Sequence, residues 1–115
     1  MRVIVCGGRD FDDRDSAFAA LDRLHAETPI TLVVHGGARG ADTMAGEWAV
    51  ARSISVEVYA ADWQRHRRSA GPKRNQQMAD AGADLCVAFP GGKGTADMVR
   101  RATAAQITVV APLAT

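Results

Sequence analysis

Glycine and basic residues gather in three short segments whose composition suits the binding of an anion. The first, second and third glycine segments are GGRD at residues 7–10, GGARGAD at 36–42 and PGGKGT at 90–95. Glycine costs backbone entropy, and a backbone without Cβ atoms lets a ligand approach closely. A tight turn alone needs fewer glycines than these segments contain, so we favour anion binding over a purely structural role. The residues expected to hold a phosphate are Gly7, Gly8, Arg9, Gly36, Gly37, Arg39, Gly40, Gly91, Gly92, Lys93, Gly94 and Thr95.

Each glycine segment follows a short apolar run and leads into a helical pattern. Five apolar runs occur, at residues 3–6, 32–34, 56–60, 85–89 and 107–110, with helical patterns between them. This alternation predicts a parallel sheet with helices on both faces. The third run alternates polar and apolar residues, which is typical of an edge strand, and right-handed crossovers then favour the strand order 3-2-1-4-5. The predicted fold is therefore α/β, a Rossmann-like doubly wound parallel sheet of five strands, in one domain over residues 1–115.

Local signals set the expected ends of the helices. Asp12 or Asp13 can cap the first helix, and Thr28-Pro29 ends it. After the third strand we expect a longer loop, and then a helix that has Pro72 in its first turn and ends near Gly82. In the predicted sheet the chain reverses direction between the first and fourth strands, and ligands bind beyond the carboxyl ends of the strands at such a point. All three glycine segments fall on that edge, each before a helix N-terminus that attracts anions.

Two better-known nucleotide motifs are absent. GKGT around Lys93 is not the G-x-x-x-x-G-K-[ST] of a Walker A loop, and GGRD after the first strand is not G-x-G-x-x-G. The sequence thus supports neither a P-loop NTPase nor a nicotinamide dehydrogenase. Among the acids, Asp10 and Asp42 are expected to be helix caps, whereas Asp97 either complements its helix dipole or places a carboxylate over a bound sugar.

A basic stretch stands out on a chain whose formal net charge is only +1. Between Asp62 and Asp80 there is no acid, while Arg65, Arg67, Arg68, Lys73 and Arg74 fall there. Such a patch suits an anionic ligand, and a solvated loop is the alternative. Trp63 beside it can stack on a base or simply pack. His35, at the end of the second strand, is a weak acid-base candidate, and His25 is expected to be exposed.

The two cysteines, Cys6 and Cys86, lie in apolar runs and fit no metal-binding spacing. We interpret them as small buried side chains of a protein in a reducing compartment. Neither a signal peptide nor a membrane-spanning run is recognised, so a cytoplasmic protein is expected. No metal and no cofactor is expected.

The sequence resembles two families that share a superfamily. RNQQM at 74–78 followed by ADLCVAFPGGKGT at 83–95 is similar to the LOG ("lonely guy") phosphoribohydrolases, with their Arg-Lys-x-x-Met run and PGGxGTxEE motif. HGGARGAD at 35–42 is similar to the glycine loop of the DprA (Smf) DNA-processing family. Together with GGRDF at 7–11, these motifs resemble the small YspA-type members of the SLOG superfamily over nearly the whole chain.

The resemblance implies a Rossmann-like fold that binds nucleotides or ligands derived from them. LOG enzymes cleave the N-glycosidic bond of nucleoside 5′-monophosphates with an Arg and a Glu. Arg74 matches that Arg, Asp97 stands at the Glu position, and Met98 replaces the second Glu. Because Asp is one methylene shorter, a carboxylate meant to stabilise an oxocarbenium-like centre can fall out of reach. Arg74 and Asp97 are therefore the catalytic candidates of a site whose chemistry is in question.

Three functions follow, in order of preference. The first is binding of a nucleotide or nucleotide-derived molecule, as a ligand sensor. The second is a working phosphoribohydrolase. The third is a DprA-like protein that binds single-stranded nucleic acid, against which stands the lack of an aromatic cluster for stacking. A homodimer is expected, because small residues such as Ala102, Ala104 and Ala105 suit a helix interface.

Overall fold

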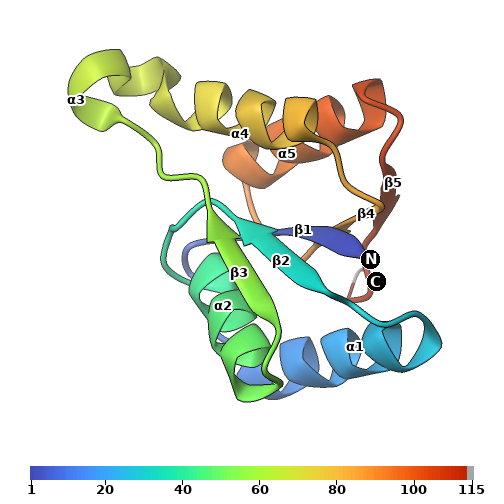
Figure 1. The fold of residues 1–115 in the computed structure, drawn as a ribbon. Coiled ribbons are helices and arrows are strands. Elements are labelled where there is room, and N and C mark those ends of the chain that lie inside the picture. Colours follow the sequence, from blue (N-terminus) through green and yellow to red (C-terminus); the bar gives the residue numbers. More distant parts are fainter. Residues whose placement is uncertain (114–115) are drawn as a thin grey trace.

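The computed structural model describes residues 1–113 and shows five strands connected by helices (Figure 1). The elements are β1 (Arg2–Cys6), α1 (Arg14–Glu27), β2 (Leu32–His35), α2 (Ala41–Ala51), β3 (Ser55–Val58), α3 (Trp63–His66), a 3-10 turn (Arg67–Ser69), α4 (Ala70–Ala81), β4 (Leu85–Ala88), α5 (Lys93–Ala104) and β5 (Thr108–Val110).

All neighbouring strands are parallel, and their order is β3-β2-β1-β4-β5. In the centre, Ile4 of β1 is paired with Val34 of β2 on one side and with Cys86 of β4 on the other. The predicted order is thus confirmed, with β3 at an edge. The chain reverses its winding between β1 and β4, so the ends of these two strands mark the expected ligand-binding edge.

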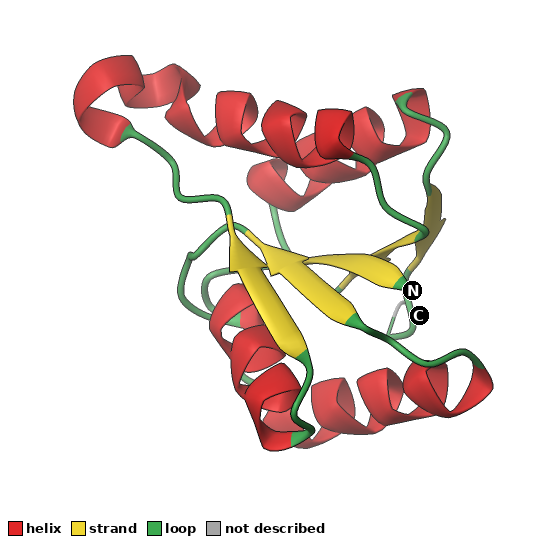
Figure 2. Cartoon of the chain, in the orientation of Figure 1, coloured by secondary structure: helices red, strands yellow, loops and turns green. Residues whose placement is uncertain are grey.

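Helices cover both faces of the sheet (Figure 2). On one face, α1 and α2 pack Leu21 and Trp48 against Val3 and Val33. On the other, α4 and α5 pack residues such as Met78 against Ile4 and its neighbours on that face. Successive strand residues point to opposite faces, so the continuous apolar runs of β1 and β4 follow from their being buried on both sides. No helix of residues 1–113 is both long and apolar enough to cross a lipid bilayer.

The segment between β3 and α4 differs from the expected loop. It forms α3 and a 3-10 turn, and the Asp62 carboxylate caps α3 by accepting the Arg65 N–H at 3.1 Å. Neither glycine nor proline interrupts residues 62–70, so the cap is enough to start a turn of helix. Helix α4 then begins at Ala70, which places Pro72 in its first turn as predicted, and Gly82 ends it with φ of 81°.

The structure confirms one smaller expectation and corrects two others. Of the two candidate caps for α1, Asp13 is used, accepting the Ser16 N–H at 3.2 Å. His25 is only partly exposed, because its Nδ1 accepts the Ile30 N–H at 2.9 Å and closes the turn after α1. Ala102 is fully buried against the sheet with Met98, so it is unavailable for the interface expected at α5.

Candidate functional site

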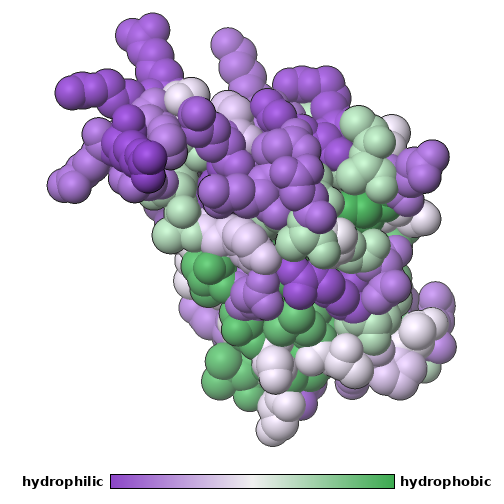
Figure 3. Space-filling model, turned by 45° about the horizontal axis from the view of Figure 1, so that its top comes forward, coloured by the Kyte–Doolittle hydropathy of each residue, from purple (hydrophilic) through white to green (hydrophobic). Residues whose placement is uncertain are grey.

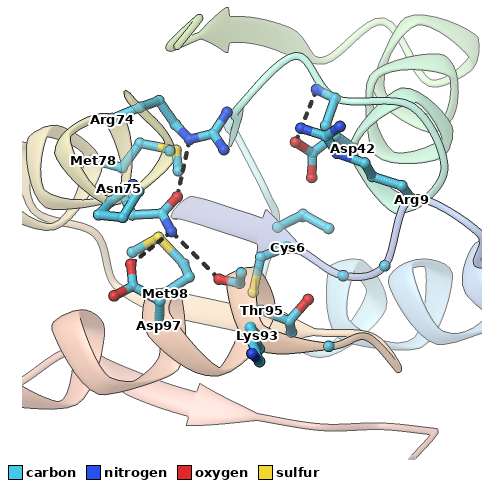
Figure 4. Close-up of a pocket in the computed structure, with 18 of the residues that line it drawn as sticks. Cys6, Arg9, Asp42, Arg74, Asn75, Met78, Lys93, Thr95, Asp97 and Met98 are labelled. Carbon is cyan, nitrogen blue, oxygen red and sulfur yellow. Dashed lines mark hydrogen bonds between the residues drawn. The ribbon is translucent and has the colours of Figure 1, made fainter. Parts of the chain in front are cut away.

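The three glycine segments meet at the carboxyl edge of the sheet, around one cavity of about 500 Å³ (Figure 4). They follow β1, β2 and β4, which are adjacent in the sheet. Of the residues expected to bind or act on a ligand, those that line the cavity are Gly7, Gly8, Arg9, Arg74, Gly92, Lys93, Gly94, Thr95 and Asp97. Those that lie outside its lining are Gly36, Gly37, Arg39, Gly40 and Gly91.

Backbone hydrogen bonds tie the glycine segments to one another. The Gly8 N–H donates to Pro90 O at 2.8 Å, and the Ala41 N–H donates to Gly8 O at 3.2 Å. Gly40 packs so closely on this junction that an added Cβ would overlap Gly8 O, and its φ of 78° already favours glycine. Several of the glycines therefore serve the contact between segments. The Gly8 amide is itself engaged in that contact, so it is not free for a ligand.

Free backbone donors remain at the start of α5. The first helical hydrogen bond of α5 runs from the Ala96 N–H to Gly92 O at 3.0 Å. Within residues 1–113, the N–H groups of Lys93, Gly94 and Thr95 donate to no protein acceptor. These are the groups that a helix N-terminus leaves for an anion. All three residues line the cavity.

In the second glycine segment, by contrast, the backbone N–H groups donate to side chains of the same stretch of chain. Asp42 Oδ2 accepts the N–H groups of Gly36 and Ala38, both at 3.1 Å, and His35 Nδ1 accepts the Gly37 N–H at 3.0 Å. Asp42 thus holds the loop before its helix. Burial raises the pKa of Asp42, while the hydrogen bond from Ala38 and the charges of His35 and Arg74 oppose that rise.

The cations expected at the site separate into two groups. Arg9, Arg74 and Lys93 line the cavity. Arg39 points away into solvent, 76% exposed, and forms an ion pair with Asp10 at 3.2 Å. Exposed pairs of this kind contribute little to stability. The positive charge at the cavity therefore comes from the first and third glycine segments, from α4, and from Arg100 of α5, which also lines the cavity and is paired with Asp97.

Arg74 and Asp97 are joined by a residue that the sequence analysis did not single out. Asn75 Oδ1 accepts from Arg74 Nε at 2.9 Å, and Asn75 Nδ2 donates to Asp97 Oδ2 at 3.0 Å (Figure 4). Arg74 Nη1 also donates to Gly36 O at 2.6 Å, which fixes the guanidinium between α4 and the second glycine segment. Burial lowers the pKa of Arg74. Asn75 is itself buried, and a buried amide directly beside Arg74 is the signal that could have marked it.

Both carboxylate oxygens of Asp97 are occupied. Oδ1 accepts from Arg100 at 3.2 Å, and Oδ2 accepts from Arg101 at 2.9 Å in addition to Asn75. Burial by itself would raise the pKa of Asp97, but the hydrogen bonds from Arg101 and Asn75 outweigh it, so the pKa lies below its ordinary value. Asp97 is therefore an anion whose charge is already compensated.

Trp63 lies at the cavity and is half exposed, with the Arg9 guanidinium 5.7 Å from its ring centre. The basic side chains of Arg65, Arg67 and Arg68 are exposed beyond it, on α3 and the 3-10 turn. Figure 3 shows hydrophilic side chains projecting from this corner of the molecule. Within residues 1–113, the guanidinium groups of Arg65, Arg67 and Arg68 form no ion pair and donate no hydrogen bond.

The histidine and cysteine side chains offer little chemistry here. His35 does not line the cavity; it faces a second hollow beside α2, together with Gly46 and Val56. Cys6 lines the cavity, where the neighbouring Cys86 thiol and burial raise the pKa of its own thiol, so it is a poor nucleophile. Residues 1–113 contain no group of three or more His, Cys, Asp or Glu side chains that could hold a metal ion.

Comparison with known proteins shows the family of this chain. The profile of the YspA, cpYpsA-related SLOG family (YAcAr) matches residues 1–66, which include the first two glycine segments. The chain is also 43% identical to the Gene 61 protein of Mycobacterium phage D29 over 117 residues, covering 95% of this chain and 94% of that protein. The chain belongs to the YspA, cpYpsA-related SLOG family.

Proposed function

We propose that this protein binds a nucleoside phosphate, with the phosphate at the N-terminus of α5. The observation that carries this proposal is the set of free N–H groups of Lys93, Gly94 and Thr95, which open onto a cavity between Arg9 and Arg74. Backbone amides and guanidinium groups are the usual ligands of a phosphate in proteins. Membership of the SLOG family supports the same class of ligand.

The rest of the cavity suits a nucleoside. Its volume of about 500 Å³ lies in the range of small-molecule sites. Val5, Met78 and Met98 give it apolar walls, and the half-exposed Trp63 offers an aromatic face on which a base can stack. A phosphate at α5 and a base against Trp63 would both lie within this one cavity.

The alternative of N-glycosidic cleavage is favoured by one observation, the presence of both Arg74 and Asp97 at the cavity. We propose binding rather than cleavage, because Asp97 is held by Asn75, Arg100 and Arg101. A carboxylate whose charge is already compensated by two guanidinium groups stabilises a developing oxocarbenium ion less than a free one does.

A calorimetric titration with AMP, adenosine, ribose 5-phosphate and inorganic phosphate tests the proposal. AMP should bind, and adenosine should bind at least tenfold more weakly because it lacks the phosphate. Lys93→Gln should weaken AMP binding, whereas Lys73→Gln, an exposed cation of α4 outside the cavity, should leave it unchanged. Equal affinity for AMP and adenosine, or no binding of either, would overturn the proposal.

The same samples test for cleavage. After prolonged incubation with AMP, chromatography should show no adenine above the level of a buffer blank. Adenine that appears with wild-type protein and disappears with Asp97→Asn would establish the phosphoribohydrolase instead. A single-stranded oligonucleotide that binds more tightly than AMP, and loses affinity in Arg67→Ala and Arg68→Ala, would favour nucleic acid as the ligand.

A further inference from the structure

Asp42 carries a buried carboxylate oxygen that the fold does not use. The residue is only 6% exposed, and its Oδ2 accepts both hydrogen bonds that hold the second glycine segment. Oδ1 accepts none from residues 1–113. No buried side-chain oxygen in that part of the chain is both sealed from solvent and without a partner. Oδ1 must therefore be reachable, and the space that Asp42 lines is the cavity (Figure 4).

Neither folding nor a neighbouring cation explains the charge at this position. An asparagine could hold the loop equally well, because one amide oxygen can accept both N–H groups. Arg74 contributes to the electrostatic environment of Asp42, but its hydrogen bonds go to Gly36 O and Asn75 Oδ1. Burying a carboxylate is costly unless its oxygens find partners. A ligand that supplies the missing donor would remove that cost.

We propose that Asp42 Oδ1 accepts a hydrogen bond from a neutral donor of the bound ligand, a ribose hydroxyl or an amino group of the base. This inference rests on the proposed function and assigns a second polar contact to the same cavity. A carboxylate repels phosphate oxygens, so the phosphate is confined to the free amides of α5 and the sugar or base faces Asp42. The cavity thereby distinguishes a nucleoside phosphate from inorganic phosphate or pyrophosphate, which carry no such donor.

Asp42→Asn separates this role from loop support. The amide oxygen can keep both hydrogen bonds to Gly36 and Ala38, while an NH₂ group replaces the oxygen that faces the cavity. A lost hydrogen bond to a charged group should weaken AMP binding about tenfold to a hundredfold. Pyrophosphate binding should stay equal or become tighter, because a negative charge leaves the cavity. Asp80→Asn, on the exposed side of α4, is the matched control for the loss of one acid.

Analogues identify the donor in wild-type protein without any substitution. Titrations use 2′-deoxy-AMP, 3′-deoxy-AMP and IMP, which lack the 2′-hydroxyl, the 3′-hydroxyl and the amino group of AMP respectively. The analogue that lacks the contacted group should bind to the wild type more weakly than AMP does. The Asp42→Asn variant should bind that analogue no more weakly than the wild type does.

Three results would overturn the inference while the proposed function stands. One is AMP binding by Asp42→Asn that equals or exceeds that of wild type. The second is a parallel loss of AMP and pyrophosphate binding, which would indicate a displaced loop. The third is equal binding of AMP and all three analogues by the wild type. This third test does not need the variant, so it can be made even if Asp42→Asn fails to fold. If wild type binds neither AMP nor pyrophosphate, the inference and the proposed function fail together.

Discussion

Asn75 on α4 donates a hydrogen bond to the Asp97 carboxylate on α5 across 3.0 Å, and so joins the two helices beneath the cavity. Its other amide atom accepts from Arg74. Because both polar ends of a side chain that is only 5% exposed are used, Asn75 determines where the cation and the anion of the site lie. It is a positioning residue for both.

We expect Asn75→Leu to lower the free energy of unfolding by about 1–3 kcal/mol, since it leaves buried polar partners without their hydrogen bonds. Urea denaturation followed by circular dichroism measures this. Gln77→Leu, an exposed position of the same helix, should change stability by less than about 0.5 kcal/mol. A cost for Asn75→Leu no greater than that of the control would contradict the structural role of the amide.

Gly94→Ala should raise the stability of the protein and at the same time weaken its binding of AMP. Gly94 occupies the first turn of α5, and an added Cβ meets no atom within 4 Å. Alanine should stabilise the helix by roughly 0.5–1 kcal/mol. On a helix the Cβ leans toward the N-terminus, so the methyl group should also crowd an anion held there and weaken AMP binding.

The control for Gly94→Ala is Thr103→Ala, at an exposed position near the other end of α5. It also replaces a weaker helix former with alanine, and it should leave AMP binding unchanged. Thermal melting and calorimetry on both variants provide the comparison. If Gly94→Ala binds AMP with wild-type affinity, the phosphate does not lie at this helix end.

The fold followed from the sequence because its determining signals are local. The apolar runs of β1, β2 and β4, the alternating β3, and the order of strands and helices are all visible in one chain. The position of the glycine segments followed from the same topology. What the sequence did not reveal is which donors stay free. The amides of Gly8 and Gly36 are used by Pro90 and Asp42, a division of roles that depends on tertiary contacts.

Gly40→Ala should be far more damaging than Gly82→Ala, although both glycines have a positive φ. At Gly82 an added Cβ meets nothing within 4 Å, so only the strain of a backbone conformation that favours glycine remains, about 1–3 kcal/mol. At Gly40 the Cβ would also overlap the backbone of Gly8 and Arg9, which cannot move without opening the junction between segments. The unfolding midpoints of the two variants measure the difference, and equal midpoints would show that the junction is not rigid.

The stability of the protein should fall as the pH is lowered from 7.5 to 5, and His35 should be one cause. Burial lowers the pKa of His35, although the Asp42 carboxylate opposes the shift and Arg74 adds to it. The unfolded chain therefore binds a proton near pH 6.5 that the folded chain takes up only at lower pH, so stability is lost across that interval.

A specific contact accompanies this titration. In the neutral ring, His35 Nδ1 accepts the Gly37 N–H, and a protonated ring cannot accept it. Urea denaturation at pH 5.0 and 7.5 should show a smaller pH dependence for His35→Asn than for wild type, by up to about 1 kcal/mol. Asp42 acts in the opposite sense, because its raised pKa makes stability fall as the pH rises between 3.8 and its folded value. The comparison therefore uses the difference in the free energy of unfolding between wild type and variant at each pH. If this free energy depends on pH identically in the two proteins, His35 has the same pKa in the folded and unfolded states.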